Sequence, residues 1–452
     1  MKFLVLVFDG LRADHVTPEL MPNLSRLAGE GVHFPESRSV FPSETRVNQA
    51  SLITGCHPAR HGLVANKFHA PELRPGEMFN TANYEQLDAA TKVGRLLDMP
   101  SLAERLRAAG GSLAVAGCGT PGGNRLLNLD ALDHGEVNVS LHGPARSATP
   151  DALAAMVERI GPVPRASLPN SAQLAWLADA YMDFLVPEVD PTVAIVWFSE
   201  PDGSYHYRGV GSRAARAAIT ACDRELGRLL AWIDGRDINL VVLSDHGHLS
   251  TLGGPVGLPA KLARAGLGTD VDAVAGLCGS LYLNGADPDP VCRWLRQQDW
   301  CGPVFARGEI DGALPLAAAN LDHPRAGDIV FVLAQSMAAA NGAPAGVGRH
   351  DNGDIPTGCG MHGGLTLAEL NNVLVLSGPA FGDARRDETP AGIVDVAPTL
   401  LTLLGLPNQG MDGRDLLAPA GPATGQRHAT GAHTLTTRQV DGTVYLDRTI
   451  TE

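Results

Sequence analysis

The sequence predicts an α/β fold, a three-layer sandwich in which helices cover both faces of a mostly parallel sheet. Continuous apolar runs of strand length occupy residues 2–8, 193–198 and 238–243, as is typical of strands buried on both faces. Helical patterns alternate with these runs, and the longest is an amphipathic stretch over residues 213–234. Because parallel strands are joined by crossover helices that pack on the sheet, this alternation favours helices on both faces.

The remaining elements are marked by turn and capping residues. Proline in the first turn of a helix and serine at its N-cap position both favour a helix start. Asp-Gly favours a tight hairpin turn. In chain order, these signals predict helices beginning at Pro22 and Ser101, a strand at 113–116, a strand at 280–283, a helix at 289–298, a strand at 372–377, a helix at 393–405 and a hairpin at Asp441-Gly442.

One inserted segment interrupts the pattern of the core. Residues 251–357 are rich in glycine, alanine and proline and contain short strand and helix units of their own. We therefore expect a catalytic core of residues 1–250 and 358–425, an inserted cap subdomain of residues 251–357, and a C-terminal tail of residues 426–452 that contains the hairpin. A cap at the ends of the strands is well placed to shape a substrate site.

Side chains that bind metals follow the predicted core strands where those strands end. Ligand sites in open α/β sheets form outside the carboxyl ends of the strands, so we expect these side chains to converge. Three carboxylates and three imidazoles are available: Asp9, Asp202, His206, Asp245, His246 and His362. They divide into two groups of three, Asp202/His206/His362 and Asp9/Asp245/His246, each suited to a divalent metal. The second group needs one more donor.

Thr45 is the candidate for that donor. Pro42 and Ser43 end a loop and Thr45 opens a short predicted helix, so its hydroxyl would lie at the positive end of the helix dipole. A free threonine hydroxyl is a weak nucleophile, and metal coordination is one way to activate it. Two divalent ions a few ångströms apart would bind its oxygen and a phosphoryl oxygen, as in-line displacement at phosphorus requires. Without the metal-binding residues, Thr45 would be interpreted as a helix cap.

Six motifs occur in one order between about residues 3 and 410. They are Phe8-Asp9-Gly10-Leu11-Arg12, Pro42-Ser43-Glu44-Thr45-Arg46-Val47-Asn48, Thr54-Gly55-Cys56-His57-Pro58-Ala59-Arg60-His61-Gly62, Glu200-Pro201-Asp202 with His206, Ser244-Asp245-His246-Gly247, and His362-Gly363. In these motifs the chain resembles the alkaline phosphatase superfamily, and within it the nucleotide pyrophosphatase/phosphodiesterase-like branch. The resemblance implies an alkaline-phosphatase-like fold and two divalent metal ions, usually Zn²⁺ and in some relatives manganese or iron.

The resemblance also implies roles for individual residues. One ion would be bound by Asp202, His206 and His362, and the other by Asp9, Thr45, Asp245 and His246. Thr45 would be the nucleophile and would form a covalent phospho-threonine intermediate. Asn48, on the same helical face as Thr45, would donate to a non-bridging phosphoryl oxygen. The histidines near the motifs that are expected to be neighbours of the ligands or surface groups are His57, His61 and His248.

Departures from the pattern of this branch bear on the substrate. Nucleotide-cleaving relatives usually carry Phe-Pro after the nucleophile, and this chain has Arg46-Val47. Arg46 could instead bind an anionic group, since guanidinium pairs with carboxylate or phosphate. The candidate substrate-binding residues are Arg46, Lys67, Phe68 and Tyr205. A sulfatase is disfavoured, because the position of its modified cysteine holds Thr45, whereas Cys56 falls beyond the Thr54-Gly55 turn.

We therefore expect a bimetallic phosphoric ester hydrolase, a phosphodiesterase that acts through phospho-threonine at Thr45. The alternative enzyme is a phosphonate hydrolase of the phosphonoacetate type, which would cleave a carbon–phosphorus bond by the same route. The non-enzymatic alternative is a catalytically silent binding protein on the same scaffold. Such a protein would keep the fold and lack some of the metal-binding residues. The predicted partner is a small-molecule phosphoester or phosphonate.

Composition limits the other partners. The net charge is −14 and no run of lysine or arginine exceeds two residues, which argues against a nucleic-acid-binding face. No window approaches the roughly 18 to 20 apolar residues of a membrane helix, so no membrane partner is expected. The seven cysteines form no C-x-x-C pair, which favours reduced thiols and a cytoplasmic location. The oligomeric state is left open, a homo-oligomer included.

Overall fold

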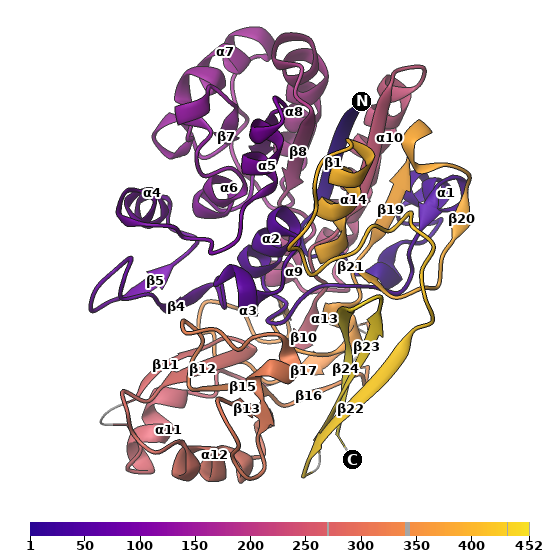
Figure 1. The fold of residues 1–452 in the computed structure, drawn as a ribbon. Coiled ribbons are helices and arrows are strands. Elements are labelled where there is room, and N and C mark those ends of the chain that lie inside the picture. The colour runs from indigo at the N-terminus through magenta and orange to yellow at the C-terminus, as the bar shows by residue number, and fades with distance from the viewer. Residues whose placement is uncertain (269–270, 340–343, 432, 452) are drawn as a thin grey trace.

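The computed structural model describes residues 1–268, 271–339, 344–431 and 433–451, and its largest sheet has eight strands (Figure 1). The strand order is β20-β2-β19-β9-β1-β8-β6-β7. The bounds of these strands are β1 Lys2–Phe8, β2 Val32–His33, β6 Leu113–Gly117, β7 Asn138–Ser140, β8 Val193–Phe198, β9 Ile238–Leu243, β19 Leu374–Ser377 and β20 Arg385–Arg386. The central strands β9, β1 and β8 are the three apolar runs from which the sheet was predicted.

The three central strands end at the same edge of the sheet. β1 runs parallel to both β8 and β9, and Val7 lies opposite Trp197 on one side and Leu243 on the other. β6 extends the parallel part beside β8, whereas β19 runs antiparallel to β9. The sheet is therefore mostly parallel, as predicted, and the residues that follow β1, β8 and β9 leave it close together.

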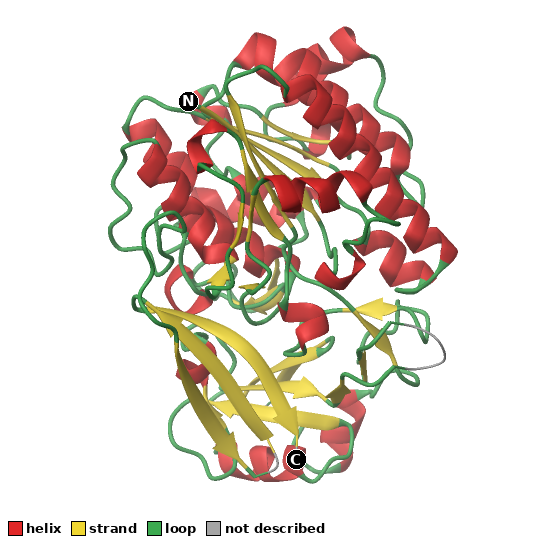
Figure 2. Ribbon diagram, turned by 90° about the vertical axis from the view of Figure 1, so that its right-hand side faces the viewer, coloured by secondary structure: helices red, strands yellow, loops and turns green. Residues whose placement is uncertain are grey.

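Helices cover both faces of this sheet, which confirms the predicted three-layer α/β sandwich (Figure 2). Side chains of β1 alternate between two cores, with Phe3, Val5 and Val7 in one and Leu4, Leu6 and Phe8 in the other. The first core takes side chains from α2 Thr45–Thr54, α4 Tyr84–Val93, α5 Leu102–Ala108, α6 Pro121–Leu127 and α14 Val396–Leu403. The second takes them from α1 Pro22–Glu30, α7 Pro150–Ile160, α8 Ser171–Ala180 and α10 Arg213–Ile233.

Shorter elements connect these layers. The small helices and paired strands are α3 Pro58–His61, α9 Asp202–Arg208, α13 Leu367–Leu370, β3 Ser37–Arg38 with β21 Ala391–Gly392, and β4 Lys67–His69 with β5 Met78–Asn80. The single-turn 3-10 helices are η1 Ala13–His15, η2 Leu132–His134, η3 Pro144–Arg146, η5 Leu316–Ala319, η6 Pro379–Phe381 and η7 Ile393–Asp395, and α8 continues as the π-helix η4 Tyr181–Val189. The helix predicted over residues 393–405 thus begins as η7 and continues as α14. None of the helices in the described ranges combines the length and the apolar character needed to cross a bilayer.

The segment between β9 and β19 builds further sheets below the main one in Figure 1. Their elements are β10 Leu249–Thr251, α11 Leu258–Arg264, β11 Asp272–Ala275, β12 Cys278–Tyr282, α12 Pro288–Arg296, β13 Cys301–Ala306, β14 Leu314–Pro315, β15 Ile329–Leu333, β16 Gln335–Ser336, β17 Val347–Gly348 and β18 Gly360–Met361. A five-stranded sheet, β11-β12-β15-β13-β14, packs with α11 and α12 around a separate core. β10 and β18 pair antiparallel, so the chain leaves and rejoins the core at neighbouring points.

The chain ends in a three-stranded antiparallel sheet, β22 Thr424–Thr430, β23 His433–Val440 and β24 Thr443–Thr451. The turn between β23 and β24 contains Asp441 and Gly442, both with positive φ, as the hairpin turn at that dipeptide requires. Tyr445 belongs to the first core of the main sheet, and its hydroxyl donates to Asp395 at 2.9 Å. This sheet is therefore packed on the core, and the hairpin predicted from the sequence gains β22 as a third strand.

Candidate metal centre

The candidate site lies at the edge where β1, β8 and β9 end. Asp9 follows β1 directly, and its carbonyl accepts the amide N–H of Asp202 at 3.0 Å, which ties the first turn of α9 to β1. Gly10, with φ of +71°, makes the turn after β1 and donates its N–H to Oδ1 of Asp245 at 3.0 Å. The loops that leave three neighbouring strands are therefore bonded to one another. This is why residues far apart in the sequence converge.

The first group of candidate ligands contains Asp9, Asp245 and His246, all buried. Nε2 of His246 lies 3.2 Å from Oδ2 of Asp245 and 3.7 Å from Oδ1 of Asp9. The hydroxyl of Thr45 is 3.1 Å from the same Nε2. Thr45 is the first residue of α2, and Glu44 is its N-cap, so the helix start was predicted at the right residue. The structure brings these four side chains together.

The second group contains Asp202, His206 and His362, and also His248. Their possible donor atoms all lie within 4.8 Å of one another. Nε2 of His206 is 3.2 Å from Oδ1 of Asp202, and Nε2 of His362 is 3.7 Å from it. The rings of His246 and His362 are stacked with centroids 3.8 Å apart, so the two groups adjoin.

Backbone carbonyls fix the tautomer of three histidines. Nδ1 of His206 lies 2.8 Å from the carbonyl of Gly360, and Nδ1 of His362 lies 2.8 Å from the carbonyl of Ser43. Nδ1 of His246 is 3.0 Å from the carbonyl of Gly247. A carbonyl only accepts, so the proton of each ring is on Nδ1 and the Nε2 lone pair faces the site. This is the arrangement that neutral imidazole ligands of metals adopt.

The buried carboxylates give the site negative charge that is not fully compensated. Oδ1 of Asp9 and Oδ2 of Asp245 are buried and have no hydrogen-bond partner among the described residues. Burial raises the pKa of Asp9 well above its usual value, and the neighbouring carboxylates of Asp245 and Asp202 raise it further. Burial likewise raises the pKa of Asp245. A divalent cation would neutralise these oxygens and complete their coordination, so the donor set fits the two ions that the sequence predicted.

A cavity of about 440 Å³ opens onto the second group. A second hollow of about 260 Å³ reaches Asp9, and Thr45, Arg46 and Asp202 line both. Asn66 and Lys67 line the larger one, and the insertion contributes to it as well, chiefly through Ala275, Cys278, Ser280 and Asn352. The candidate nucleophile therefore lies where the two hollows meet.

Two of the four predicted substrate-binding residues line this cavity, and two do not. Arg46 and Lys67 lie on its wall. Phe68 is fully buried and packs on Phe79 with ring centroids 5.6 Å apart, because adjacent side chains of β4 alternate in direction. Tyr205 is also fully buried, and its hydroxyl forms a 2.5 Å hydrogen bond with Nδ1 of His15. Phe68 and Tyr205 are thus placed in the core.

Asn48 does not face the cavity either. It is fully buried in α2, where its Nδ2 donates to the carbonyl of Glu44 at 3.0 Å. Its Oδ1 accepts the N–H of Val40 at 2.9 Å. Both ends of the amide are therefore used to hold the loop before α2. Asn66, which the sequence interpretation left out, lies on the cavity wall and accepts the N–H of Arg46 at 3.3 Å.

His248 was also left out of the ligand set, although it lies within the second group. The signal for it in the sequence was its position two residues after His246. For Asn66 we find no signal apart from its position next to Lys67.

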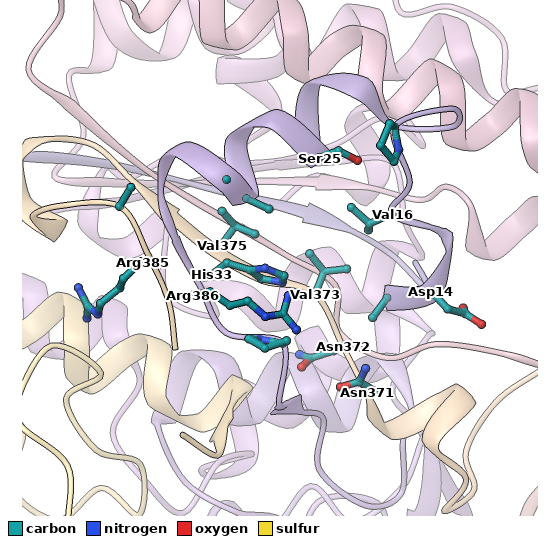
Figure 3. Close-up of a pocket in the computed structure, with 16 residues that line it drawn as sticks. Asp14, Val16, Ser25, His33, Asn371, Asn372, Val373, Val375, Arg385 and Arg386 are labelled. Carbon is teal, nitrogen blue, oxygen red and sulfur yellow. The ribbon is translucent and has the colours of Figure 1, made fainter. Parts of the chain in front are cut away.

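A larger cavity of about 780 Å³ lies elsewhere, between α1, β19 and β20 (Figure 3). Its arginines are already paired, Arg386 with Glu388 at 2.7 Å and Arg385 with Asp387 at 3.6 Å. Within the described ranges, neither of the two groups of potential metal ligands lies on this cavity. Volume alone would make this cavity the candidate functional site. The groups of potential metal ligands instead favour the smaller cavity at the ends of the strands.

The fold and the two groups of potential ligands define an α/β protein with a candidate two-metal site at the ends of its parallel strands. A family model described as type I phosphodiesterase / nucleotide pyrophosphatase matches residues 3–351. The chain therefore belongs to this family, which confirms the resemblance seen in its motifs.

Curated relatives match shorter segments. Bis(5'-adenosyl)-triphosphatase enpp4 of Xenopus laevis is 37% identical over 92 residues, which are 20% of this chain and 20% of the relative. Ectonucleotide pyrophosphatase/phosphodiesterase family member 3 of Mus musculus is 23% identical over 251 residues, which are 53% of this chain and 24% of the relative. The chain thus spans about a quarter or less of the length of these two relatives.

Two solved structures share the fold. Murine ectonucleotide pyrophosphatase / phosphodiesterase 5 has a TM-score of 0.65 at 20% identity, covering 92% of this chain and 99% of that one. Phosphonoacetate hydrolase from Sinorhizobium meliloti 1021, in complex with phosphonoformate, has a TM-score of 0.65 at 21% identity, covering 89% and 95%. At these identities the likeness establishes the fold.

Proposed function

We propose that the protein is a two-metal hydrolase of phosphoric esters, a phosphodiesterase in which Thr45 is the nucleophile. The observation that carries this proposal is the position of the Thr45 hydroxyl. It lies 3.1 Å from Nε2 of His246, at the start of a helix and in the wall shared by both hollows. A hydroxyl placed there can reach both a metal ion and a phosphoryl group.

The two donor groups would divide the metal ions between them. One ion would be held by Asp202, His206 and His362, and the other by Asp9, Thr45, Asp245 and His246. Nitrogen and carboxylate donors in small groups suit Zn²⁺, and they also accept manganese or iron. When bound, the ions supply Lewis-acid stabilisation of the threonine oxygen and of the negative charge on the phosphoryl group.

The chain's own residues carry the remaining steps. The Thr45 hydroxyl passes its proton to water, and its oxygen attacks phosphorus. The bond from phosphorus to the leaving oxygen breaks, that oxygen keeps the electron pair and takes a proton from water, and the phosphoryl group stays on Thr45. The positive end of α2 favours the threonine alkoxide. A second water then attacks phosphorus, the bond between phosphorus and the Thr45 oxygen breaks, and that oxygen regains a proton as the phosphate product leaves. The amide of Asn66 is better placed than that of Asn48 to donate to a phosphoryl oxygen, because it lines the cavity.

Arg46 and Lys67 support a substrate with negative charge beyond the reacting phosphorus. Both line the same cavity. Burial lowers the pKa of Arg46, and the charges of the nearby carboxylates Glu44, Asp9, Asp202 and Asp245 offset part of that lowering. Two cations can bind the unreactive oxygens of a phosphoester or a separate carboxylate. The second candidate function is therefore a phosphonate hydrolase that cleaves a carbon–phosphorus bond through the same threonine. The phosphonoacetate hydrolase among the solved structures supports this alternative.

A catalytically silent binding protein is the third candidate. Such a protein would have lost ligands, and all seven predicted side chains lie in the two groups or beside them. The intact donor set therefore favours an enzyme.

One pair of assays tests these candidates. Purified protein loaded with Zn²⁺ or Mn²⁺ is given bis(p-nitrophenyl) phosphate in one assay and phosphonoacetate in the other. Release of p-nitrophenol supports the phosphodiesterase, and release of acetate supports the phosphonate hydrolase. The matched control is Thr45→Ala, which should be inactive in whichever assay the parent is active. No turnover of either compound, or of phosphate monoesters, by protein that holds two ions per chain would favour the binding protein.

A further inference from the structure

His248, a buried histidine outside the predicted ligand set, lies against the carboxylate of Asp202. It follows β9 and is fully buried. Its Nε2 is 2.8 Å from Oδ1 of Asp202, closer than the Nε2 atoms of His206 and His362. The three imidazoles surround that oxygen with ring centroids 4.7, 4.9 and 5.1 Å apart. His248 is therefore either a fourth metal ligand or a hydrogen-bond donor to a ligand.

The position of the ring proton distinguishes the two roles. His206 and His362 each donate from Nδ1 to a carbonyl at 2.8 Å, which leaves a lone pair on Nε2 for a metal. Nδ1 of His248 has no hydrogen-bond partner in the part of the chain that the structure describes. A neutral imidazole carries one ring proton, and only at Nε2 does His248 have an acceptor for it. That acceptor is the carboxylate of Asp202.

The distances agree with a hydrogen bond. Donor atoms on one tetrahedral zinc ion lie about 3.3 Å apart, since each is about 2 Å from the metal. The separations of Oδ1 of Asp202 from His206 and His362 are 3.2 and 3.7 Å, whereas the 2.8 Å to His248 is an ordinary hydrogen-bond length. Three protein donors also leave a coordination position open for substrate, and a fourth would close a tetrahedral site.

The surroundings hold the ring of His248 in this orientation. A β-carbon at Gly10 would lie 2.9 Å from its Nε2, and one at Gly360 would lie 2.8 Å from its Nδ1. The ring of Tyr205 packs beside it with centroids 5.0 Å apart. Arg12 donates from Nη1 to the carbonyl of His248 at 2.7 Å. The imidazole therefore fits between Gly10 and Gly360 because neither residue has a β-carbon.

We propose that His248 is a positioning residue that donates Nε2–H to Oδ1 of Asp202 and so orients this carboxylate for the metal ion held with His206 and His362. The inference rests on the proposed two-metal function. A carboxylate that is already oriented loses less freedom when it binds a cation. Removal of the donor should therefore weaken metal binding at this site by roughly 10- to 100-fold.

Nuclear magnetic resonance of the protein labelled with ¹⁵N-histidine and loaded with ¹¹³Cd tests the assignment directly. We expect one-bond coupling between ¹¹³Cd and Nε2 of His206, His246 and His362, and a protonated, uncoupled Nε2 on His248. Coupling at His248 would show that it is a metal ligand. That result would overturn this inference and leave the proposed two-metal function standing. Absence of coupling at every histidine would overturn the two-metal function and the inference with it.

Two variants of matched volume test the donor role by metal affinity. His248→Gln keeps an N–H near the position of Nε2, and His248→Leu removes it. Chelator competition with Zn²⁺ should show that His248→Leu binds one of its two ions roughly 10- to 100-fold more weakly, while His248→Gln stays near the parent protein. Parent-like affinity of His248→Leu, or equal weakening in both variants, would refute the donor role.

Discussion

The hydroxyl of Thr45 lies 3.1 Å from Nε2 of His246, although the two residues are 201 positions apart. Thr45 opens α2, which packs on one face of the sheet, and His246 follows the central strand β9. The contact therefore joins the helical layer to the edge of the sheet. Under the proposed function, the same contact brings the nucleophile to the metal ligands.

Thr45→Ala should abolish turnover and leave the metal content near two ions per chain. The remaining donors still form two groups, whereas the hydroxyl 3.1 Å from Nε2 of His246 is removed. We expect a loss of roughly 10³- to 10⁶-fold in kcat, as when a nucleophile is removed elsewhere. Steady-state kinetics and metal analysis of the same preparation check both parts. Thr45→Ser is the matched variant and should keep measurable activity; a fully active Thr45→Ala would exclude the assignment.

His362→Ala should lower the metal content to about one ion per chain. His362 presents Nε2 to Asp202, and Asp202 and His206 would hold the ion less well without it. Atomic absorption after dialysis measures the stoichiometry. His134→Ala, at an exposed position, is the control and should retain both ions. If His362→Ala keeps two ions after the same dialysis, His362 is not a ligand.

Arg46→Met should raise KM more than it lowers kcat. The guanidinium lines the cavity and would bind unreactive oxygens of the substrate in the ground state and in the transition state alike. We expect an increase in KM of roughly tenfold, the equivalent of one charged hydrogen bond. Lys92→Met is the control, because Lys92 is exposed and pairs only with Asp88 among the described residues. An unchanged KM would place the anion of the substrate elsewhere.

Asp9→Asn should stabilise the metal-free protein and destabilise the metal-loaded one. Burial and the neighbouring carboxylates raise the pKa of Asp9, so its charge is unfavourable until a cation neutralises it. The amide keeps an oxygen for Nε1 of Trp197, which donates to Oδ2 of Asp9 at 2.9 Å in the parent. Thermal unfolding with excess chelator and with excess Zn²⁺ measures the two states. If Asp9→Asn has a higher Tm than the parent both in chelator and in Zn²⁺, or a lower Tm in both, no cation binds at Asp9.

Glu369→Gln should change the pH dependence of stability. The carboxylate of Glu369 holds the loop after His362, accepting the N–H of Gly364 at 2.7 Å and the hydroxyl of Thr366 at 2.6 Å. Burial raises its pKa from 4.5 to about 7. Between these values the unfolded chain loses this proton and the folded protein keeps it, so the free energy of unfolding falls as pH rises.

The fall is complete above about pH 7 and amounts to at most about 3 kcal/mol. The free energy of unfolding of the parent minus that of Glu369→Gln should therefore decrease between pH 4.5 and pH 8. Urea unfolding of both proteins in chelator measures this difference. A difference that stays constant with pH would show that Glu369 titrates alike in the folded and unfolded chains.

The central part of the fold could be read from the sequence because its signals are local. β1, β8 and β9 are continuous apolar runs, and α10 is one long amphipathic pattern. β19 was found as a strand, but its antiparallel pairing with β9 depends on long-range packing that no local pattern reports. The same holds for β22, whose residues are mostly exposed and which is held by pairing with β23.

At the candidate site, the acidic and imidazole side chains that the structure brings together were singled out from the sequence, except His248, and the neutral Asn66 was not. Acidic and imidazole side chains at strand ends are rare enough to stand out. Asn66 lines the cavity, whereas the amide of Asn48 is bonded to the carbonyl of Glu44. Which of the two asparagines faces the cavity depends on how β4 and α2 pack, and no local pattern in the sequence reports that packing. Phe68 and Tyr205 were expected near the substrate because they neighbour motif residues, yet side-chain direction places both in the core.

The order of the candidate ligands along the chain bears on how the protein is made. Asp9 precedes Asp245 and His246 along the chain, and His362 follows only after the whole segment that separates it from β9. A nascent chain that has reached Asp245 and His246 can complete one donor group while the other still lacks a member. The donor group that contains His362 would therefore be completed only after the segment between β9 and β18 has been synthesised.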